Sequence, residues 1–374
     1  MIRLSLQPMA AQIRLVFWIL FFVLSANLGI AAGSDSLVTA RMDSSGLHAM
    51  EYPKDTIWPK SVTGYYDDYS NMLGLFLYAK QKYSSFGVYD ISTKKTLLYS
   101  PNKQLNMGFG FNYKWLGIGI AFNLGFVNND DDLYGKTKRL DWQTNIYTNK
   151  AVFDFYLQSY KGHYIENPEQ VFSGWKNGDA PYIRPDLSTV SLGLSGMYVF
   201  NHKKFSYKAA FMQTAVQKKG AGSFLLGASF FVQGIAGDSS IFPKTSDFDS
   251  LPPVIAHSAI YFGLRTAYAY NFIIAKHYFI SVSLAAELQL GKTANKLEDN
   301  SVYASWNPII HLQPRMAFGY NKPKWYTGFS FVRDSYFEGS SRDESRYEFS
   351  FKSGNFRLFA GMRFNWLSRK ELMD

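Results

Sequence analysis

The sequence predicts an all-β protein, a transmembrane antiparallel β-barrel of about 12 strands (14 is the alternative count), preceded by a cleaved signal peptide. Three observations predict it: an apolar leader, long segments in which large apolar residues alternate with small ones, and aromatic residues gathered at the segment ends. Of the 374 residues 18% are charged, below the roughly 25% usual in soluble domains. The chain has no cysteine, which excludes a disulfide scaffold, a thiolate metal site and a cysteine nucleophile.

The leader is the first element. Arg3 and Arg14 precede the unbroken apolar run 15–24, and small residues follow between Gly29 and Gly33. A positive start, an apolar stretch and a small-residue end are the pattern of a secretory signal. We expect residues 1–32 to be removed as a signal peptide, with an uncleaved anchor helix as the alternative. No later segment supplies the ~20 consecutive apolar residues of a spanning helix.

The alternating segments decide the fold class. In 118–126 every even position is Ile, Leu or Phe and every odd position is Gly, Ala or Asn, and 105–113 and 280–290 repeat the pattern. Side chains alternate between the two faces of a strand, so each segment has one large apolar face and one small or polar face. A secreted β-sandwich, the alternative, would carry solvated charge on its second face. Here that face suits a lumen, and the apolar face suits lipid.

Aromatic residues gather where these segments end, as Tyr113 does with Trp115 and Tyr320 with Trp325. Amphipathic rings suit the boundary between membrane and water. The alternative explanation is the ordinary preference of strands for aromatic residues.

Thirteen segments qualify as strands, but single-chain bacterial barrels have an even number. We therefore expect twelve strands, and the parity slips around 217–256. Either 238–256 hides a further crossing or 70–80 is not a strand. The candidates are 70–80, 105–113, 115–127, 137–148, 151–162, 187–200, 205–217, 222–235, 257–272, 277–291, 307–320, 324–334 and 345–366.

This organisation predicts three parts: the signal peptide, a periplasmic segment over 33–69, and the barrel over 70–374. Short and long connections alternate along the barrel, as periplasmic turns and outer loops do. The expected location is the outer membrane of a Gram-negative bacterium.

Several stretches resemble a known family. They are Tyr99–Asn102 with 105–126, the turn 218–224, and 262–291. They are similar to the Bacteroidota outer-membrane proteins that share domain of unknown function 4421, over roughly residues 50–370. The resemblance implies a barrel and no established activity.

Charged residues on the small face are the candidate site, since the lumen should contain them. Four arginines against two carboxylates predict a positive interior, and hence a passage or docking site for an anionic solute. The alternative is a salt-bridge network that supports the wall of a closed barrel. The candidates are Asp154, Lys208, Arg265, Glu287, His311, Arg315, Arg357 and Arg363.

Catalytic, metal and cofactor sites are not expected. The six histidines are not paired at spacings of two or four residues, so no metal site is predicted. His257 and Ser258 are adjacent and would point to opposite faces, and no Gly-x-Ser-x-Gly elbow occurs. The acidic loop 128–132 lacks the spacing of a calcium loop and is interpreted as solvated.

The function that follows is a non-enzymatic pore or transporter for small or anionic solutes. The alternatives are a structural surface barrel with a plugged lumen, and an enzyme that modifies lipid or lipopolysaccharide. Expected partners are outer-membrane lipid and lipopolysaccharide, together with the barrel-assembly machinery during biogenesis. Despite the net charge of +10, nucleic acid is not expected as a partner of an exported, aromatic-rich chain. No oligomeric state follows from the sequence.

Overall fold

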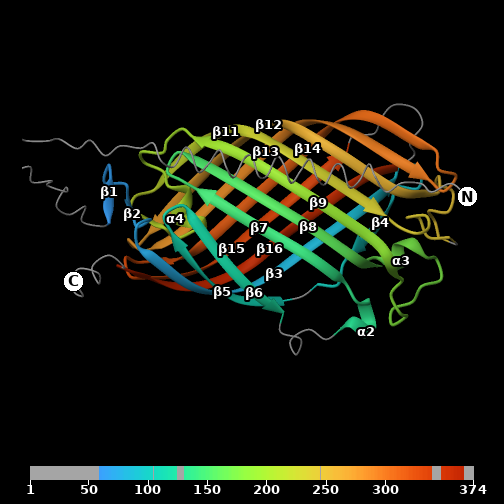
Figure 1. The fold of residues 1–374 in the computed structure, drawn as a ribbon, viewed down its shortest axis with the longest axis horizontal. Coiled ribbons are helices and arrows are strands. Elements are labelled where there is room, and N and C mark those ends of the chain that lie inside the picture. The colour runs from blue at the N-terminus through green and yellow to red at the C-terminus, as the bar shows by residue number, and fades with distance from the viewer. Residues whose placement is uncertain (1–58, 104, 124–129, 245, 339–346, 366–374) are drawn as a thin grey trace, which may run out of the picture. The chain divides into compact units, whose positions relative to one another are not determined.

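The computed structural model describes residues 59–103, 105–123, 130–244, 246–338 and 347–365 (Figure 1). The chain divides into two units, 1–56 and 57–374, and all the described residues belong to the second. The predicted signal peptide therefore lies outside the described residues, as does most of the predicted periplasmic segment.

Twelve long antiparallel strands form the wall of the second unit, which confirms the predicted barrel and its count of about twelve. Each pairs with the next in this order except β6 with β7, and β16 pairs with β3 along both whole strands. The strands are β3 (Leu73–Asp90), β5 (Leu105–Tyr113), β6 (Leu116–Asn123), β7 (Lys138–Tyr147), β8 (Ala151–Ile165), β9 (Ile183–Val199), β11 (Ala221–Ala236), β12 (Val254–Ile274), β13 (Tyr278–Leu297), β14 (Val302–Asn321), β15 (Trp325–Glu338) and β16 (Tyr347–Phe364).

One predicted strand is wrong, and its removal restores the even count. Residues 205–217 contain the short helix α4 (Tyr207–Phe211) and the three-residue strand β10 (Ala215–Gln217). The apolar residues here are consecutive rather than alternating, and Tyr207 to Ala210 are all buried. Such a segment has no polar face to turn to a lumen, so it packs inside. Both explanations offered for the parity slip are thus wrong, because β3 is a strand and the described residues between β11 and β12 contain no further crossing.

The faces of the strands are inverted relative to a soluble protein. Along β12, Phe262 and Leu264 are exposed, the latter by 70%, whereas Tyr261 and Arg265, which flank this stretch, are fully buried. A surface of large apolar side chains around a closed sheet, with charges inside, is stable only when lipid surrounds it. The chain is therefore an outer-membrane β-barrel. No helix of the described residues is long and apolar enough to cross a membrane.

The two ends of the barrel differ. β3 begins and β16 ends at the same end, where tight turns also join β5 to β6, β7 to β8, β12 to β13 and β14 to β15. Short turns mark the periplasmic end of such barrels. Aromatic rings gather there, since Tyr320 lies 4.8 Å from both Tyr278 and Trp325 between ring centroids.

A plug segment, residues 205–217, fills the periplasmic end of the barrel. Its β10 pairs with β2 (Tyr66–Asp68), which pairs with β1 (Lys60–Val62), and Figure 1 shows α4 at the same end as these strands. Inward side chains of the wall bind its backbone carbonyls. Asn271 Nδ2 donates to Ser206 O at 3.0 Å, and Arg363 Nε donates to Gln213 O at 2.9 Å.

Apolar side chains fill the outer end. The connection 237–253 folds inward, and its Ile241, Phe242 and Phe248 pack in one buried cluster with Phe86 of β3. Tyr99 OH donates to Ile241 O at 2.8 Å and holds the connection in place. Both ends of the barrel axis are therefore occupied by the chain itself.

Candidate functional site

A network of charged side chains crosses the middle of the barrel. Glu287 on β13 forms an ion pair with Arg265 on β12, and its Oε1 lies 2.8 Å from His311 Nδ1 on β14. His311 Nε2 lies 3.1 Å from Asp334 Oδ1 on β15. The strand register places these residues at one level, because Arg265 pairs with Glu287 and Glu287 with His311. Adjacent strands thus present opposite charges to each other.

A second pair continues the network across the lumen. Arg315 Nη2 lies 2.5 Å from Asp154 Oδ2, although the two residues come from opposite parts of the chain. Tyr147 OH donates to Asp154 Oδ1 at 2.7 Å, and Gln313 on β14 accepts from Arg265 and from Arg315. Five of the eight candidate residues therefore meet here: Asp154, Arg265, Glu287, His311 and Arg315.

The other three candidates lie elsewhere. Lys208 is on α4 rather than on a strand, and its Nζ donates to Asp68 Oδ2 at 2.8 Å within the periplasmic plug. Arg363 binds the plug, as described above. Arg357 is half-buried, with its guanidinium 5.0 Å from the Phe76 ring centroid and 5.2 Å from that of Tyr78.

Within this network the expected positive balance does not hold. Asp334, which the sequence analysis missed, is buried and joins the network, so three carboxylates face two arginines and His311. Asp334 has an even number, like Tyr326 and Ser330 on the same strand, and these two side chains also point inward. The alternation was therefore the signal that could have identified Asp334.

The barrel wall has a seam between β6 and β7. In the described residues β6 pairs only with β5, and β7 pairs only with β8. Beyond the seam, toward the outer end, β4 (Lys95–Ser100) pairs with β3 and makes two residue pairs with β8. The nine strands from β8 around to β3 are thus closed by β4 into a ring of ten, while β5, β6 and β7 extend the wall toward the periplasmic end.

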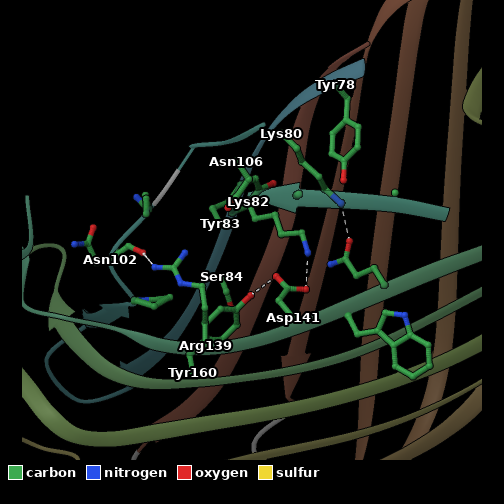
Figure 2. Close-up of a pocket in the computed structure, with 16 residues that line it drawn as sticks. Tyr78, Lys80, Lys82, Tyr83, Ser84, Asn102, Asn106, Arg139, Asp141 and Tyr160 are labelled. Carbon is green, nitrogen blue, oxygen red and sulfur yellow. Dashed lines mark hydrogen bonds and ion pairs between the residues drawn. The ribbon is translucent and has the colours of Figure 1, made fainter. Parts of the chain in front are cut away.

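A cavity of about 290 Å³ lies at this seam. Residues of β3, β6, β7, β8 and 101–103 line it, and Figure 2 shows side chains from these elements pointing toward one another. We call it the seam chamber. Its β6 side is made of Gly119 and Ala121, and a Cβ at Gly119 would lie 3.0 Å from the Tyr78 hydroxyl. The small residues of β6 therefore provide the space.

The chamber is rich in cations. Lys82 Nζ lies 2.5 Å from Asp141 Oδ1, and Tyr160 OH donates to the other oxygen of Asp141 at 2.7 Å (Figure 2). Lys80 Nζ donates to the neutral amide oxygen of Gln143 at 2.9 Å, and Arg139 Nη2 donates to the carbonyl of Asn102 at 3.0 Å.

The fourth cation, Lys103, pairs with Glu166 at 2.5 Å just outside the chamber. Burial raises the pKa of Glu166, but hydrogen bonds from Lys103 and Ser100 outweigh it and hold the pKa below its usual range. Counted formally, four basic side chains against the two carboxylates Asp141 and Glu166 leave two without a carboxylate partner, Lys80 and Arg139. The sequence analysis identified neither residue as part of a site.

His257 lies in a different environment. Its Nδ1 is 2.7 Å from Asn295 Oδ1 and its Nε2 is 3.0 Å from Glu338 Oε1, while its ring stacks on Phe349 at 4.1 Å. Both ring nitrogens thus bind an amide or a carboxylate rather than a hydroxyl nucleophile. Within the described ranges no three His, Asp or Glu side chains are grouped as metal ligands. Asp131 of the acidic loop accepts from Asn102 Nδ2 at 3.0 Å, and Asn128 and Asn129 lie outside the described residues.

Comparisons with known proteins identify a family. The model described as a domain of unknown function, DUF4421, matches residues 55–364, which include every described strand. The outer-membrane protease OmpT of Escherichia coli is 7% identical, with a TM-score of 0.33, covering 79% of this chain and 97% of that one. The toluene transporter TodX of P. putida is 7% identical, with a TM-score of 0.22, covering 79% and 90%. No curated protein sequence matches at a significant level.

Proposed function

We propose that this chain, which belongs to the DUF4421 family, is a non-enzymatic outer-membrane barrel that binds small anionic solutes and transfers them toward the periplasm. The observation that carries the proposal is the seam chamber, with Lys80 and Arg139 bonded to neutral oxygens inside it. Cationic donors held by neutral partners can exchange those partners for an anion. The bonds they then form are charge-assisted and stronger than the ones they replace.

A route onward from the chamber supports transfer rather than storage. Lys80 and Gln143 line both the seam chamber and a second cavity of about 120 Å³ at the centre of the barrel. Arg315 and Arg357 lie in the wall of this central cavity, and Phe211 of α4 lines it from the periplasmic plug. An anion that displaces the bond between Lys80 and Gln143 would meet further arginines before it reaches the plug.

We propose a non-enzyme because the ring nitrogens of His257 contact Asn295 and Glu338, and neither of these is a hydroxyl that His257 could activate. Catalysis by a hydroxyl needs a base within hydrogen-bonding distance of it. A second candidate, a structural surface barrel, is favoured by the filled axis of the barrel. It predicts no specific binding in the seam chamber, so one experiment separates the two candidates.

The experiment is equilibrium dialysis of labelled inorganic phosphate against the refolded protein in a neutral detergent. The double variant Lys80→Gln with Arg139→Gln should weaken binding by about tenfold or more, since each lost charge-assisted bond is worth about 1.5–3 kcal/mol. Lys150→Gln, an exposed lysine of the turn between β7 and β8, is the matched control and should bind as the wild type does. Equal binding by all three proteins would contradict the proposal.

A further inference from the structure

We infer that the anion bound in the seam chamber is the head of a single-chain amphiphile, which enters sideways from the lipid between β6 and β7. This inference rests on the proposed function and specifies its substrate class. A phosphate or carboxylate carrying one alkyl chain has the required chemistry. Three features of the seam support it: its unpaired strand edges, the position of Trp142, and the filled ends of the barrel axis.

The strand edges come first. In the part of the wall that the structure describes, neither β6 nor β7 has a ladder partner across the seam. Backbone groups left unpaired against hydrocarbon cost several kcal/mol each, so irregular edges at membrane depth occur only where they line a polar or water-filled space. The seam chamber is such a space. The edges therefore form a polar opening in a wall that is otherwise sealed by hydrogen bonds.

Trp142 shows that the chamber reaches the lipid-facing surface. Its side chain lines the chamber and is also 53% exposed on the outside of β7. The adjoining outer surfaces carry Ile120 and Phe122 on β6 and Leu140 on β7, all exposed. An alkyl chain could therefore remain among apolar side chains while its anionic head reaches Lys80 and Arg139 inside. Cations inside and apolar flanks outside match the two ends of an amphiphile.

The filled axis excludes the simpler route for a hydrophilic anion. At the outer end the cluster around Phe86, Ile241 and Phe242 occupies the mouth, and at the periplasmic end 205–217 does so. A free anion from the outer medium would have to displace one of these plugs. A membrane-borne anion reaches the chamber by lateral diffusion alone, so the geometry favours the membrane as its source.

The test compares dodecyl phosphate with inorganic phosphate as probes, on the refolded full chain in neutral detergent. Because the chain has no cysteine, Phe122→Cys with Trp142→Cys allows the seam to be bridged by a flexible bis-maleimide. The unbridged double variant is the first control. The second is Thr327→Cys with Ala360→Cys, a lipid-facing pair already joined within the β15–β16 ladder. Heat-modifiable gel mobility verifies that each variant is folded.

We expect dodecyl phosphate to bind at least tenfold more tightly than inorganic phosphate, and we expect this difference to be lost in the double variant Lys80→Gln with Arg139→Gln. Bridging the seam should slow dodecyl phosphate binding at least tenfold, and bridging the control pair should leave it unchanged. Equal affinities for both probes, with no effect of the seam bridge, would overturn lateral entry and leave the proposed function standing. Binding of neither probe would overturn both.

Discussion

Glu287 has the most demanding position of any single residue in the barrel. Its two oxygens accept hydrogen bonds from Ser229, Arg265 and Gln289 and contact His311, and the side chain is fully buried. A buried ion pair adds little to stability compared with apolar packing, but removing one partner leaves an uncompensated charge. The importance of Glu287 therefore lies in the Arg265 charge that it neutralises and in the His311 ring that it holds.

Glu287→Gln should destabilise the barrel by about 3 kcal/mol, because it keeps the shape and removes the counter-ion of Arg265 and His311. Urea unfolding of the protein refolded into vesicles measures the loss. Asp132→Asn, a change of the same kind at an exposed carboxylate, should alter the free energy of unfolding by less than about 0.5 kcal/mol. If both substitutions changed the free energy of unfolding by a similar, small amount, Glu287 would not be needed to balance the charges of the network.

At the residue scale the sequence alone predicted which side chains of several strands face inward. The alternation alone placed Arg265, Glu287, His311 and Arg315 on the inner face, because side-chain direction is a local property of a strand. It could not show that Arg315 meets Asp154, because that contact depends on the curvature of the whole sheet. For the same reason it could not show that Lys80 and Arg139 share a chamber.

At the element scale the plug segment 205–217 depends on one buried ion pair outside the barrel wall. Lys208 Nζ lies 2.8 Å from Asp68 Oδ2, with both side chains nearly inaccessible. Burial raises the pKa of Asp68, but the charge of Lys208 and hydrogen bonds from Lys208 and Ser70 outweigh it and hold the pKa below its ordinary value. The carboxylate therefore stabilises the plug wherever it is ionised.

This pair predicts that acid loosens the plug. A depressed pKa in the folded state gives stabilisation that is fully present above the ordinary Asp pKa of ~3.9 and is lost as the pH falls through the lower folded value. Hydrogen-exchange protection of 205–217, corrected for intrinsic rates, should therefore fall when the pH drops from ~6 to ~3. The amides of β13 should show no such fall.

Two variants control this prediction. Asp68→Asn should give the low protection at every pH, because it removes the titrating charge. Asp67→Asn should behave as the wild type does, since Asp67 pairs with the more exposed Lys218, and exposed pairs contribute little. A pH response retained in Asp68→Asn would assign the effect to another group.

The plug segment also shows where interpretation of the sequence failed at this scale. Ala209, Ala210 and Phe211 in succession do not alternate as a wall strand does. They lie beside the buried polar residues Lys208 and Gln213, so the pattern does not resemble a solvated turn either. The seam was equally hidden, because β6 and β7 each alternate as ordinary wall strands do.

At the largest scale that the described residues allow, the barrel wall of the second unit is continuous except at the seam. The wall is hydrogen-bonded from β7 through β8 and around to β6, the plug fills the periplasmic end, and an apolar cluster fills the outer end. The seam chamber and the central cavity share Lys80 and Gln143, so the described interior space leads from the seam toward the plug. This arrangement predicts where ions can and cannot flow.

The wild-type protein should give no stable conductance steps in a planar bilayer, because no water-filled path runs along the axis of the described barrel. A variant in which a short Gly-Ser turn replaces 204–218 should also give no conductance steps, and this result is the more informative one. Removing the plug opens the central cavity to the periplasmic side, but the other entrance, at the seam, still faces lipid, where ions cannot enter. Arg363→Gln with Asn321→Ala, which loosens the same plug without a deletion, should be silent too.

Steps in the plug-deleted protein alone would mean that the seam chamber opens to outer water, so that its anion arrives from solution and not from the membrane. Conductance steps in the wild-type protein would contradict the conclusion that both ends of the barrel axis are filled. Silence in all three, together with binding of dodecyl phosphate that slows when the seam is bridged, is the result expected of an entrance in the lipid. Heat-modifiable mobility of each protein is the control that separates this silence from failure to fold.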